Sequence, residues 1–316
     1  MIYGSVLDTI GNTPLVRADR LAEAEGLRAT LLLKLESRNP GGSAKDRVAV
    51  HLIDDAEKRG TLKPGGTIIE ATSGNTGVGL ALAAAVRGYH VILTMPETMS
   101  VERRKLLAGF GAELILTDGK LGMAGANEKA EELLRAIPNS MRAMQFDNPA
   151  NPETHFLSTG PEIWRDTEGK LDAFVASAGT CGTVCGTGRY LKERNANVRV
   201  YAVEPAESPM LSKGVAGPHG IQGIGANFVP KNYDPAVVDE VLTATTEESV
   251  AMAQRLMRTE GILCGISSGA AVAAAVRLLQ RAAYAGKTVV ALLPDTGERY
   301  LSTAVFAENT TDSEKG

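Results

Sequence analysis

The sequence lacks the features that mark secreted, membrane-bound or nucleic-acid-binding proteins. It has only three cysteines, Cys181, Cys185 and Cys264, among 316 residues, and an odd, sparse set does not form a disulfide framework. A zinc site is not expected either, because Cys181 and Cys185 have no second Cys or His pair nearby. The net charge of −4 provides no basic surface for nucleic acid or an anionic membrane.

Long hydrophobic runs are also missing. A run such as GVGLALAAAV at residues 77–86 is too short to span a bilayer. The first residues, MIYGSVLDTIGNTP, lack the basic region and apolar run of a signal peptide. We therefore expect a soluble cytoplasmic protein with no metal site. Its composition, 44% hydrophobic and 22% charged, is that of a globular protein long enough for two α/β domains.

Short apolar strands alternate with helices from about residue 31 onward. Strands are expected at residues 31–36, 67–73, 90–96, 112–118, 172–179, 198–205 and 288–294, and helices at 75–88, 100–108, 123–136 and 246–260. This alternation predicts mainly parallel sheets covered by helices on both faces. Two blocks, near 67–145 and 172–300, indicate two α/β lobes with a ligand cleft between them. The polar tail, residues 308–316, is expected to fray.

The first of four unusual loops places a lysine behind a Pro-Gly-Gly turn. In the stretch NPGGSAKDR, Lys45 falls in the first turn of the helix that follows, where a cation is disfavoured. Burial or the positive end of a helix lowers the pKa of a lysine and lets it form a Schiff base. The spacing is not that of a P-loop. Taken alone, the motif favours an ordinary exposed lysine.

The second loop, ATSGNTG at residues 71–77, lies between an expected strand and an Ala-rich helix. Its hydroxyl and amide side chains, together with the free N–H groups of a helix start, are suited to binding a carboxylate. The alternative is a simple N-cap. Four polar side chains are more than one cap needs, so an anion site is favoured: Thr72, Ser73, Asn75 and Thr76.

The third loop, SAGTCGTVCGTG at residues 177–188, also precedes a helix. Its glycines let the backbone approach an anion, which favours a phosphate site. A dinucleotide fold is the rival, because Glu204 ends the next strand where a ribose-binding acid would lie. The glycines do not have Gly-x-Gly-x-x-Gly spacing, which disfavours a nicotinamide-dependent dehydrogenase. Cys181 and Cys185 are interpreted as small buried residues and not as nucleophiles.

The fourth loop, GISSGAAVAAAV at residues 265–276, puts Ser267 and Ser268 at the start of a helix of small residues. Helix capping is the alternative role for these serines. A lysine, a phosphate loop and a carboxylate-binding loop together match the needs of pyridoxal phosphate. A serine facing the ring nitrogen would not protonate it as an aspartate would. Such a site suits elimination from the β-carbon better than transamination.

The motifs resemble those of the cysteine synthase (O-acetylserine sulfhydrylase) family, in its A-type form. They cover residues 3–306 in order: IGNTPLV, NPGGSAKDR, EATSGNTG, MSVERRKLL, GTCGT, IQGIGA, GISSGAAVAAA and GERYLST. The resemblance implies the PLP fold type II, the tryptophan synthase β-like fold. It implies a mobile smaller domain at 47–150 that grips the substrate, and a larger cofactor-anchoring domain at 1–46 plus 151–316. It also implies a homodimer.

The resemblance implies a role for each residue that matches a motif. Lys45 would hold pyridoxal phosphate as a Schiff base, Asn75 would hydrogen-bond the ring hydroxyl, and Ser267 would face the ring nitrogen. The phosphate would be bound by Gly179, Thr180, Cys181, Gly182 and Thr183. The substrate carboxylate would be bound by Thr72, Ser73, Gly74, Asn75 and Thr76, with Gln145 assisting.

Two residues depart from the family pattern. Cys181 stands where the phosphate loop usually has glycine, and a positive φ there would strain a cysteine. Asn227 stands where glycine is common, and asparagine tolerates the left-handed region.

The implied reaction is ping-pong β-replacement, in which O-acetyl-L-serine and sulfide give L-cysteine and acetate. Lys45 would remove the α-proton and later return it. O-phosphoserine or homocysteine are alternative substrates, although residues 206–228 contain only Lys213 and His219 as cations for a phosphate. A further alternative is a binding role, in which the cleft holds the C-terminal tail of serine acetyltransferase. The retained Lys45 argues against a purely non-catalytic protein.

Overall fold

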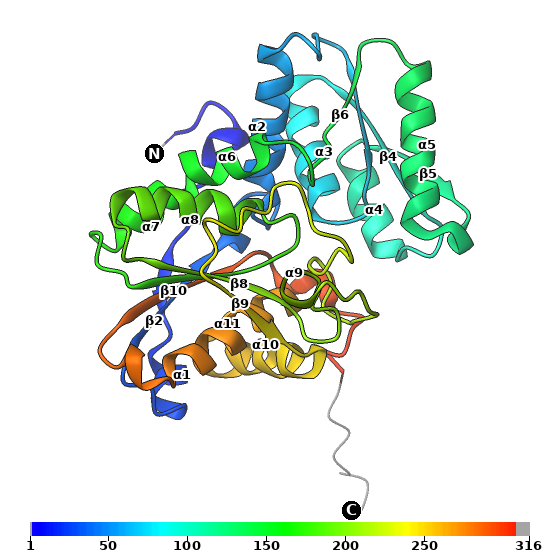
Figure 1. Cartoon of the computed structure of the whole chain (residues 1–316). Coiled ribbons are helices and arrows are strands. Elements are labelled where there is room, and N and C mark those ends of the chain that lie inside the picture. Colours follow the sequence, from blue (N-terminus) through cyan, green and yellow to red (C-terminus); the bar gives the residue numbers. More distant parts are fainter. Residues whose placement is uncertain (1, 308–316) are drawn as a thin grey trace, which may run out of the picture.

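The computed structural model describes residues 2–307, which form two sheets with helices on both faces of each (Figure 1). In this part of the chain the larger sheet has six strands in the order β1-β2-β10-β7-β8-β9. The strands are β1 (Leu15–Arg17), β2 (Thr30–Leu35), β10 (Thr288–Leu293), β7 (Ala173–Ser177), β8 (Arg199–Pro205) and β9 (Glu240–Ala244). Only the β1–β2 pair is antiparallel among these strands. The strand nearest the C-terminus, β10, therefore lies inside the sheet between β2 and β7.

The smaller sheet has four parallel strands in the order β5-β4-β3-β6 within the described residues. They are β5 (Glu113–Thr117), β4 (His90–Pro96), β3 (Thr67–Ala71) and β6 (Ser140–Arg142). Neighbouring residues of β3 point to opposite faces, as the pleat requires. Ile68 packs in the core cluster of α2 (Lys45–Lys58) and α3 (Asn75–Arg87). Ile69 packs against α5 (Gly122–Ala136) on the other face.

The larger sheet is also buried on both faces. Val289 and Ala291 of β10 face a core with α11 (Ile266–Leu279), α10 (Thr246–Glu260) and α1 (Asp19–Ala24). Val290 and Leu292 face the opposite core, formed with α7 (Thr159–Asp166) and α8 (Gly182–Arg194). The remaining elements are α4 (Val101–Gly109), α6 (Ala150–Leu157), α9 (Met210–Lys213) and the 3₁₀ turns η1 (Val6–Thr9), η2 (Glu36–Arg38), η3 (Gly119–Leu121), η4 (Ala282–Tyr284) and η5 (Gly297–Tyr300).

The predicted parallel α/β architecture is confirmed, and the strands and helices predicted by range lie within about two residues of observed ones. The loop predicted at residues 177–188 is shorter than expected, because α8 already begins at Gly182. The short strands β1, β6 and β9 and the helices α1, α6, α7 and α9 were not predicted. All strands of the smaller sheet lie within residues 47–150, and the described strands of the larger sheet lie outside that range. The domain boundary itself and the mobility of the smaller domain remain predictions. The predicted fraying at residues 308–316 lies outside the described residues.

None of the helices in residues 2–307 combines the length and hydrophobicity needed to cross a membrane. Within the same residues, no group of three or more His, Cys, Asp or Glu side chains is placed to hold a metal ion.

Candidate active site

A cavity at the carboxyl ends of the strands brings together residues that are far apart in the sequence. Three of the four predicted loops reach it directly, and the loop after β3 reaches it through Asn75. The lining residues are Lys45, Asn75, Ser177, Gly179, Thr180, Cys181, Thr183, Gly223, Ile224, Ser267, Leu292, Pro294 and Asp295. We call this the cofactor cavity. Gly182 is the one residue of the predicted phosphate loop that does not line it, and it begins α8.

Lys45 is the first residue of α2, as predicted. Burial lowers its pKa, and the nearby carboxylate of Asp295 opposes this effect. The helix packs closely on α3 because Gly79 has no side chain; a Cβ there would lie 2.8 Å from the carbonyl oxygen of Lys45. A lysine in this setting loses its proton more readily than an exposed one, which suits a nucleophile and a general base.

A buried ion-pair network anchors α2 just behind Lys45. The Arg47 guanidinium donates to Glu36 at 2.7 and 2.9 Å and to Glu162 of α7 at 2.6 and 2.8 Å. Lys34 of β2 donates to Glu162 at 2.8 Å and to the carbonyl oxygen of Thr13 at 2.6 Å. All four charged side chains are nearly inaccessible to solvent. The network therefore ties the first turn of α2 to the larger sheet.

The predicted phosphate loop joins β7 to α8 with little room for side chains. A Cβ at Gly179 would lie 2.5 Å from the carbonyl oxygen of Gly223, and one at Gly182 would lie 2.0 Å from Oδ1 of Asn151. The N-cap residue of α8 makes no side-chain cap, and the Gly182 N–H has only a long hydrogen bond to Thr180 Oγ1, at 3.4 Å. The start of α8 therefore offers N–H groups to an anion.

Two side chains of the phosphate loop are held by partners from α6. Asn151 Nδ2 donates to Thr180 Oγ1 at 2.9 Å, and His155 Nε2 lies 3.1 Å from Thr183 Oγ1. Burial, reinforced by the charge of Arg47, lowers the pKa of His155 to about 3, so its ring is neutral. The loop therefore offers an anion N–H groups and the helix dipole, without a charged imidazolium.

The position of Cys181 in the left-handed region is a finding that the sequence left open. Its φ is 62°, and it is the N-cap residue of α8. For a residue other than glycine this backbone costs about 1–2 kcal/mol. The Cys181 side chain packs in the same core cluster as Val184 and Leu191. Its backbone amide remains part of the loop that lines the cofactor cavity. Asn227 also has a φ of 62°, as its tolerance for this region allows.

The three thiols are buried in the folded protein, which confirms their interpretation as structural residues. Burial raises the pKa of each thiol, to about 11 for Cys185 and about 12 for Cys264. We therefore expect the native protein to react slowly with an aromatic disulfide reagent at pH 8, and all three thiols to react at once after unfolding in guanidinium. A single fast-reacting thiol in the native protein would contradict this arrangement. Mass spectrometry of the modified chain would identify it.

The predicted carboxylate loop connects β3 to α3. The N-cap is Gly74, and in the described structure no side chain caps this helix, so the simple capping alternative is wrong. Thr76 Oγ1 donates to Gln145 Oε1 at 2.5 Å, which brings the separately predicted Gln145 to the loop. Thr72 accepts from the Gly74 amide at 3.2 Å, and Ser73 donates to the sulfur of Met99 at 2.8 Å.

A second cavity, which we call the substrate cleft, adjoins the first and shares Asn75 and Gly223 with it. The predicted residues Thr72, Ser73, Gly74 and Gln145 line it, whereas Thr76 lies buried behind the loop. The cleft also contains residues for which sequence reasoning predicted no role: Glu70, Arg103, Arg142, Gln222, Phe228 and Tyr300.

Two arginines of the cleft come from the smaller sheet and its helices, and not from residues 206–228. Arg142 is bound to Glu131, and at 2.8 Å to Asn127. Arg103 of α4 donates to Gln222 Oε1 at 2.5 Å across the cleft. Arg103 lies inside the motif MSVERRKLL, so the sequence contained a motif that could have identified it as a cleft residue. Arg142 lies in no motif.

Two alternatives from the sequence are excluded by geometry. The Glu204 carboxylate accepts from the amides of Leu211 and Ser212 at 2.6 and 3.1 Å. It therefore caps the short helix α9 and does not act as a ribose-binding residue. The N-cap of α11 is Gly265, and neither Ser267 nor Ser268 caps that helix in the described structure. Ser267 instead lines the cofactor cavity.

The chain is similar to known proteins over almost its whole length. Residues 6–295 match the family described as "Pyridoxal-phosphate dependent enzyme". The chain is 52% identical to cysteine synthase A of Escherichia coli K12, over 97% of this chain and 96% of the relative. It is 50% identical to cysteine synthase of Haemophilus influenzae, over 96% and 98%.

Solved structures give the same result. A crystal structure of cysteine synthase from Entamoeba histolytica superposes with a TM-score of 0.94 at 45% identity, covering 100% of this chain and 93% of that one. A structure of O-ureido-L-serine synthase superposes with a TM-score of 0.94 at 46% identity, covering 99% and 98%.

Proposed function

Because the chain belongs to the pyridoxal-phosphate-dependent enzymes, and among them to the cysteine synthases, we propose that it makes L-cysteine and acetate from O-acetyl-L-serine and sulfide. One observation carries this proposal. Lys45 lies in a single cavity with Asn75, Ser267 and the loop at the start of α8, and the carboxylate loop lies in the adjoining cleft.

The residues of the cofactor cavity fit pyridoxal phosphate. Four of the five residues of the loop 179–183 line this cavity, and the loop leads into the N-terminus of α8, which suits a phosphate. Ser267 can hydrogen-bond a ring nitrogen without carrying a charge, and Lys45 can hold the cofactor covalently. When bound, pyridoxal phosphate withdraws electrons from the α-carbon and stabilises negative charge there.

We assign the proton transfers to Lys45. In its neutral form Nζ takes the α-proton of O-acetyl-L-serine as acetate leaves, and after sulfide adds to the β-carbon Nζ returns the proton. The lowered pKa of Lys45 raises the fraction of the side chain that is neutral. A neutral Ser267 leaves the ring a modest electron sink, which favours loss of the β-substituent over transamination.

We assign substrate binding to the carboxylate loop. The hydroxyls of Thr72 and Ser73 and the free N–H groups at the start of α3 can donate to the α-carboxylate. Thr76 and Gln145 hold each other at 2.5 Å, so this pair positions the loop. The cleft is lined by residues 70–147 on one side and by residues 222–228 and Tyr300 on the other, so a bound substrate would be shielded from water.

O-phosphoserine is the second candidate for the amino-acid substrate, and Arg103 is the observation that favours it. This arginine reaches the cleft from α4, and its present partner Gln222 is neutral, so a phosphate could replace that partner. Homocysteine as the sulfur donor would need room in the same cleft. We rank both below O-acetyl-L-serine and sulfide, because the relatives are named cysteine synthases.

We also propose a cytoplasmic homodimer, in which the three free thiols stay reduced.

The C-terminal tail of serine acetyltransferase is the partner that fits the carboxylate loop, because its terminal carboxylate resembles that of the substrate. A synthetic peptide of that tail should compete with O-acetyl-L-serine. A peptide that binds without competing would place the contact elsewhere.

The visible absorption spectrum of the purified protein tests the reaction. We expect a yellow protein whose band shifts when O-acetyl-L-serine is added and returns when sulfide follows, with L-cysteine released. O-phosphoserine should give a kcat/KM at least about tenfold lower, which corresponds to about 1.4 kcal/mol of transition-state binding. A band that responds only to O-phosphoserine would reverse the choice of substrate. A protein that never binds pyridoxal phosphate would overturn the proposal.

A further inference from the structure

One buried carboxylate of the cofactor cavity has no role in the reaction described above. Asp295 follows β10, is 1% exposed and lines the same cavity as Lys45. Its Oδ2 accepts from Asn75 Nδ2 at 2.7 Å and from the Tyr300 hydroxyl at 2.6 Å. Its Oδ1 has no hydrogen-bond partner within residues 2–307. Burying a carboxylate in this way is costly unless positive charge lies nearby.

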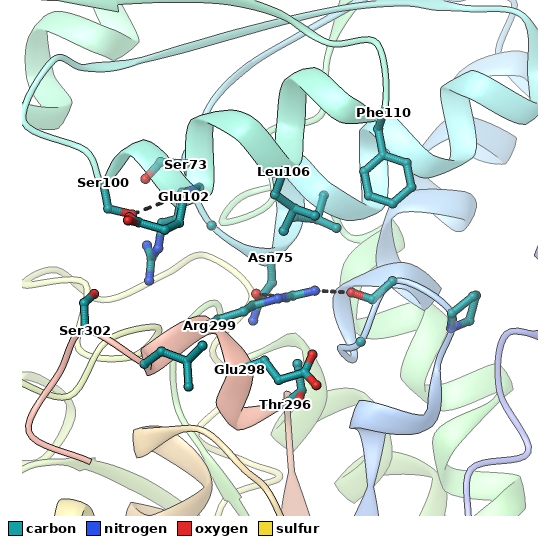
Figure 2. A pocket seen from close by; sticks show the side chains of 17 residues that line it. Ser73, Asn75, Ser100, Glu102, Leu106, Phe110, Thr296, Glu298, Arg299 and Ser302 are labelled. Atoms are coloured by element: carbon teal, nitrogen blue, oxygen red, sulfur yellow. Dashed lines mark hydrogen bonds between the residues drawn. The ribbon is translucent and has the colours of Figure 1, made fainter. Parts of the chain in front are cut away.

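Asp295 and Arg299 together determine which way the Asn75 amide faces. Arg299 donates through Nη1 to Asn75 Oδ1 and through Nη2 to the carbonyl oxygen of Gly41, and Figure 2 shows its side chain directed at Asn75. A guanidinium only donates and an ionised carboxylate only accepts, so the amide has one satisfactory orientation. That orientation leaves one N–H of Nδ2 free in a residue that lines the cofactor cavity.

The charge of Asp295 also acts on Lys45. It opposes the loss of the lysine proton that burial favours. Burial raises the pKa of Asp295 itself, and its hydrogen bonds to Tyr300 and Asn75 and the charges of Arg299 and Lys45 oppose this rise. Among the neighbouring groups Arg299 is charged, and burial raises the pKa of Asp46 to about 7. Burial and Arg47 lower the pKa of His155 to about 3, and burial raises the pKa of Cys264 to about 12, so these two side chains are uncharged. Burial and the adjacent carboxylate raise the pKa of Tyr300 well above its usual value.

We propose that Asp295 is a positioning residue: it orients Asn75 so that the remaining N–H of its amide faces the cofactor, and its charge stabilises the Lys45 ammonium that forms when the α-proton is taken up. The first part concerns geometry and the second concerns charge, so different variants separate them. Both parts rest on the proposed function, because they assume that Lys45 and pyridoxal phosphate act in this cavity.

Asp295→Asn tests the charge. The variant keeps an oxygen that can accept from Asn75 and Tyr300 but carries no charge. In the cofactor-loaded protein without substrate, we expect the pH midpoint of the visible band to move down by about one unit, since a neighbouring opposite charge shifts a pKa by that order. The acidic limb of the kcat/KM profile for O-acetyl-L-serine should move in the same direction. Both midpoints remaining at their wild-type pH would overturn this part.

Arg299→Met tests the orientation. Without the guanidinium, Asn75 Oδ1 loses its donor and the amide can turn over. We expect the dissociation constant of pyridoxal phosphate to rise about tenfold, the equivalent of one neutral hydrogen bond. Unchanged cofactor affinity would overturn this part.

Glu298→Gln is the matched control, because it removes an exposed carboxylate three residues from Asp295. It should leave both the pH midpoint and the cofactor affinity at wild-type values. Asp295→Ser repeats the charge test if the asparagine variant does not fold, because its smaller side chain also carries no charge. A wild-type protein whose band ignores O-acetyl-L-serine would instead contradict the proposed function.

Discussion

Replacing Lys45 with alanine is expected to lower kcat for cysteine formation by about three orders of magnitude or more, because the variant loses both the covalent tether and the general base. Pyridoxal phosphate should still bind through the loop at 179–183, but its visible band should respond to free amines in the buffer and not to Lys45. Stopped-flow spectra with O-acetyl-L-serine would measure the loss of the proton-transfer step.

Lys58→Ala is the matched control for this experiment. Lys58 is the last residue of the same helix, α2, and it is exposed. Its removal should leave the spectrum and kcat at wild-type values. Addition of a small primary amine should partly rescue Lys45→Ala if the missing group is a base. Full activity in Lys45→Ala would show that another residue transfers the proton.

Replacing Arg47 with methionine is expected to lower the free energy of unfolding by about 3–5 kcal/mol, because it leaves Glu36 buried without its cationic partner and Glu162 with Lys34 alone. Guanidinium denaturation followed by circular dichroism would measure this change. Arg59→Met is the control, since Arg59 forms an exposed pair with Asp55 and such pairs contribute less than about 1 kcal/mol. Equal losses in the two variants would mean that burial of the network is unimportant.

The same ion-pair network should make the stability of the folded protein depend on pH in the acidic range. Arg47 and Lys34 hold the pKa of Glu162 down to about 2, and Arg47 holds the pKa of Glu36 below its usual value. A carboxylate with a depressed pKa in the folded state stabilises the protein above its unfolded pKa, about 4.3. That stability is lost as the pH falls from about 4.5 toward 2. Unfolding measured at pH 6 and pH 3 should therefore show a steeper loss in the wild type than in Arg47→Met.

The parts of the site that the sequence predicts are those built from one strand, one loop and one helix. Lys45, the carboxylate loop and the phosphate loop each sit between a strand and a helix with strong local signals, and the structure has these elements where expected. The strands β1 and β6 were missed because three residues carry too little hydrophobic pattern.

The contacts of Asp295 and Arg299 could not be predicted from local pattern. They depend on the loop after β10 pairing with the loop before α2, where Ser43 and Asp295 form an antiparallel bridge. Only tertiary structure brings those two loops together. Glu204 illustrates the opposite error. Its separation in sequence from a glycine-rich loop suggested a ribose-binding role, but both of its carboxylate oxygens accept hydrogen bonds from backbone amides of α9.

The position of β10 has a consequence for synthesis of the chain. All four strands of the smaller sheet lie between residues 67 and 142, so they can pair while the ribosome is still at work. The larger sheet cannot be completed before residues 288–293 emerge, because β10 lies between β2 and β7 and joins the two halves of the sheet. The loop that carries Asp295 follows directly. The cofactor cavity is thus assembled only after β10 and Asp295 have left the ribosome, and until then the facing edges of β2 and β7 need protection from aggregation.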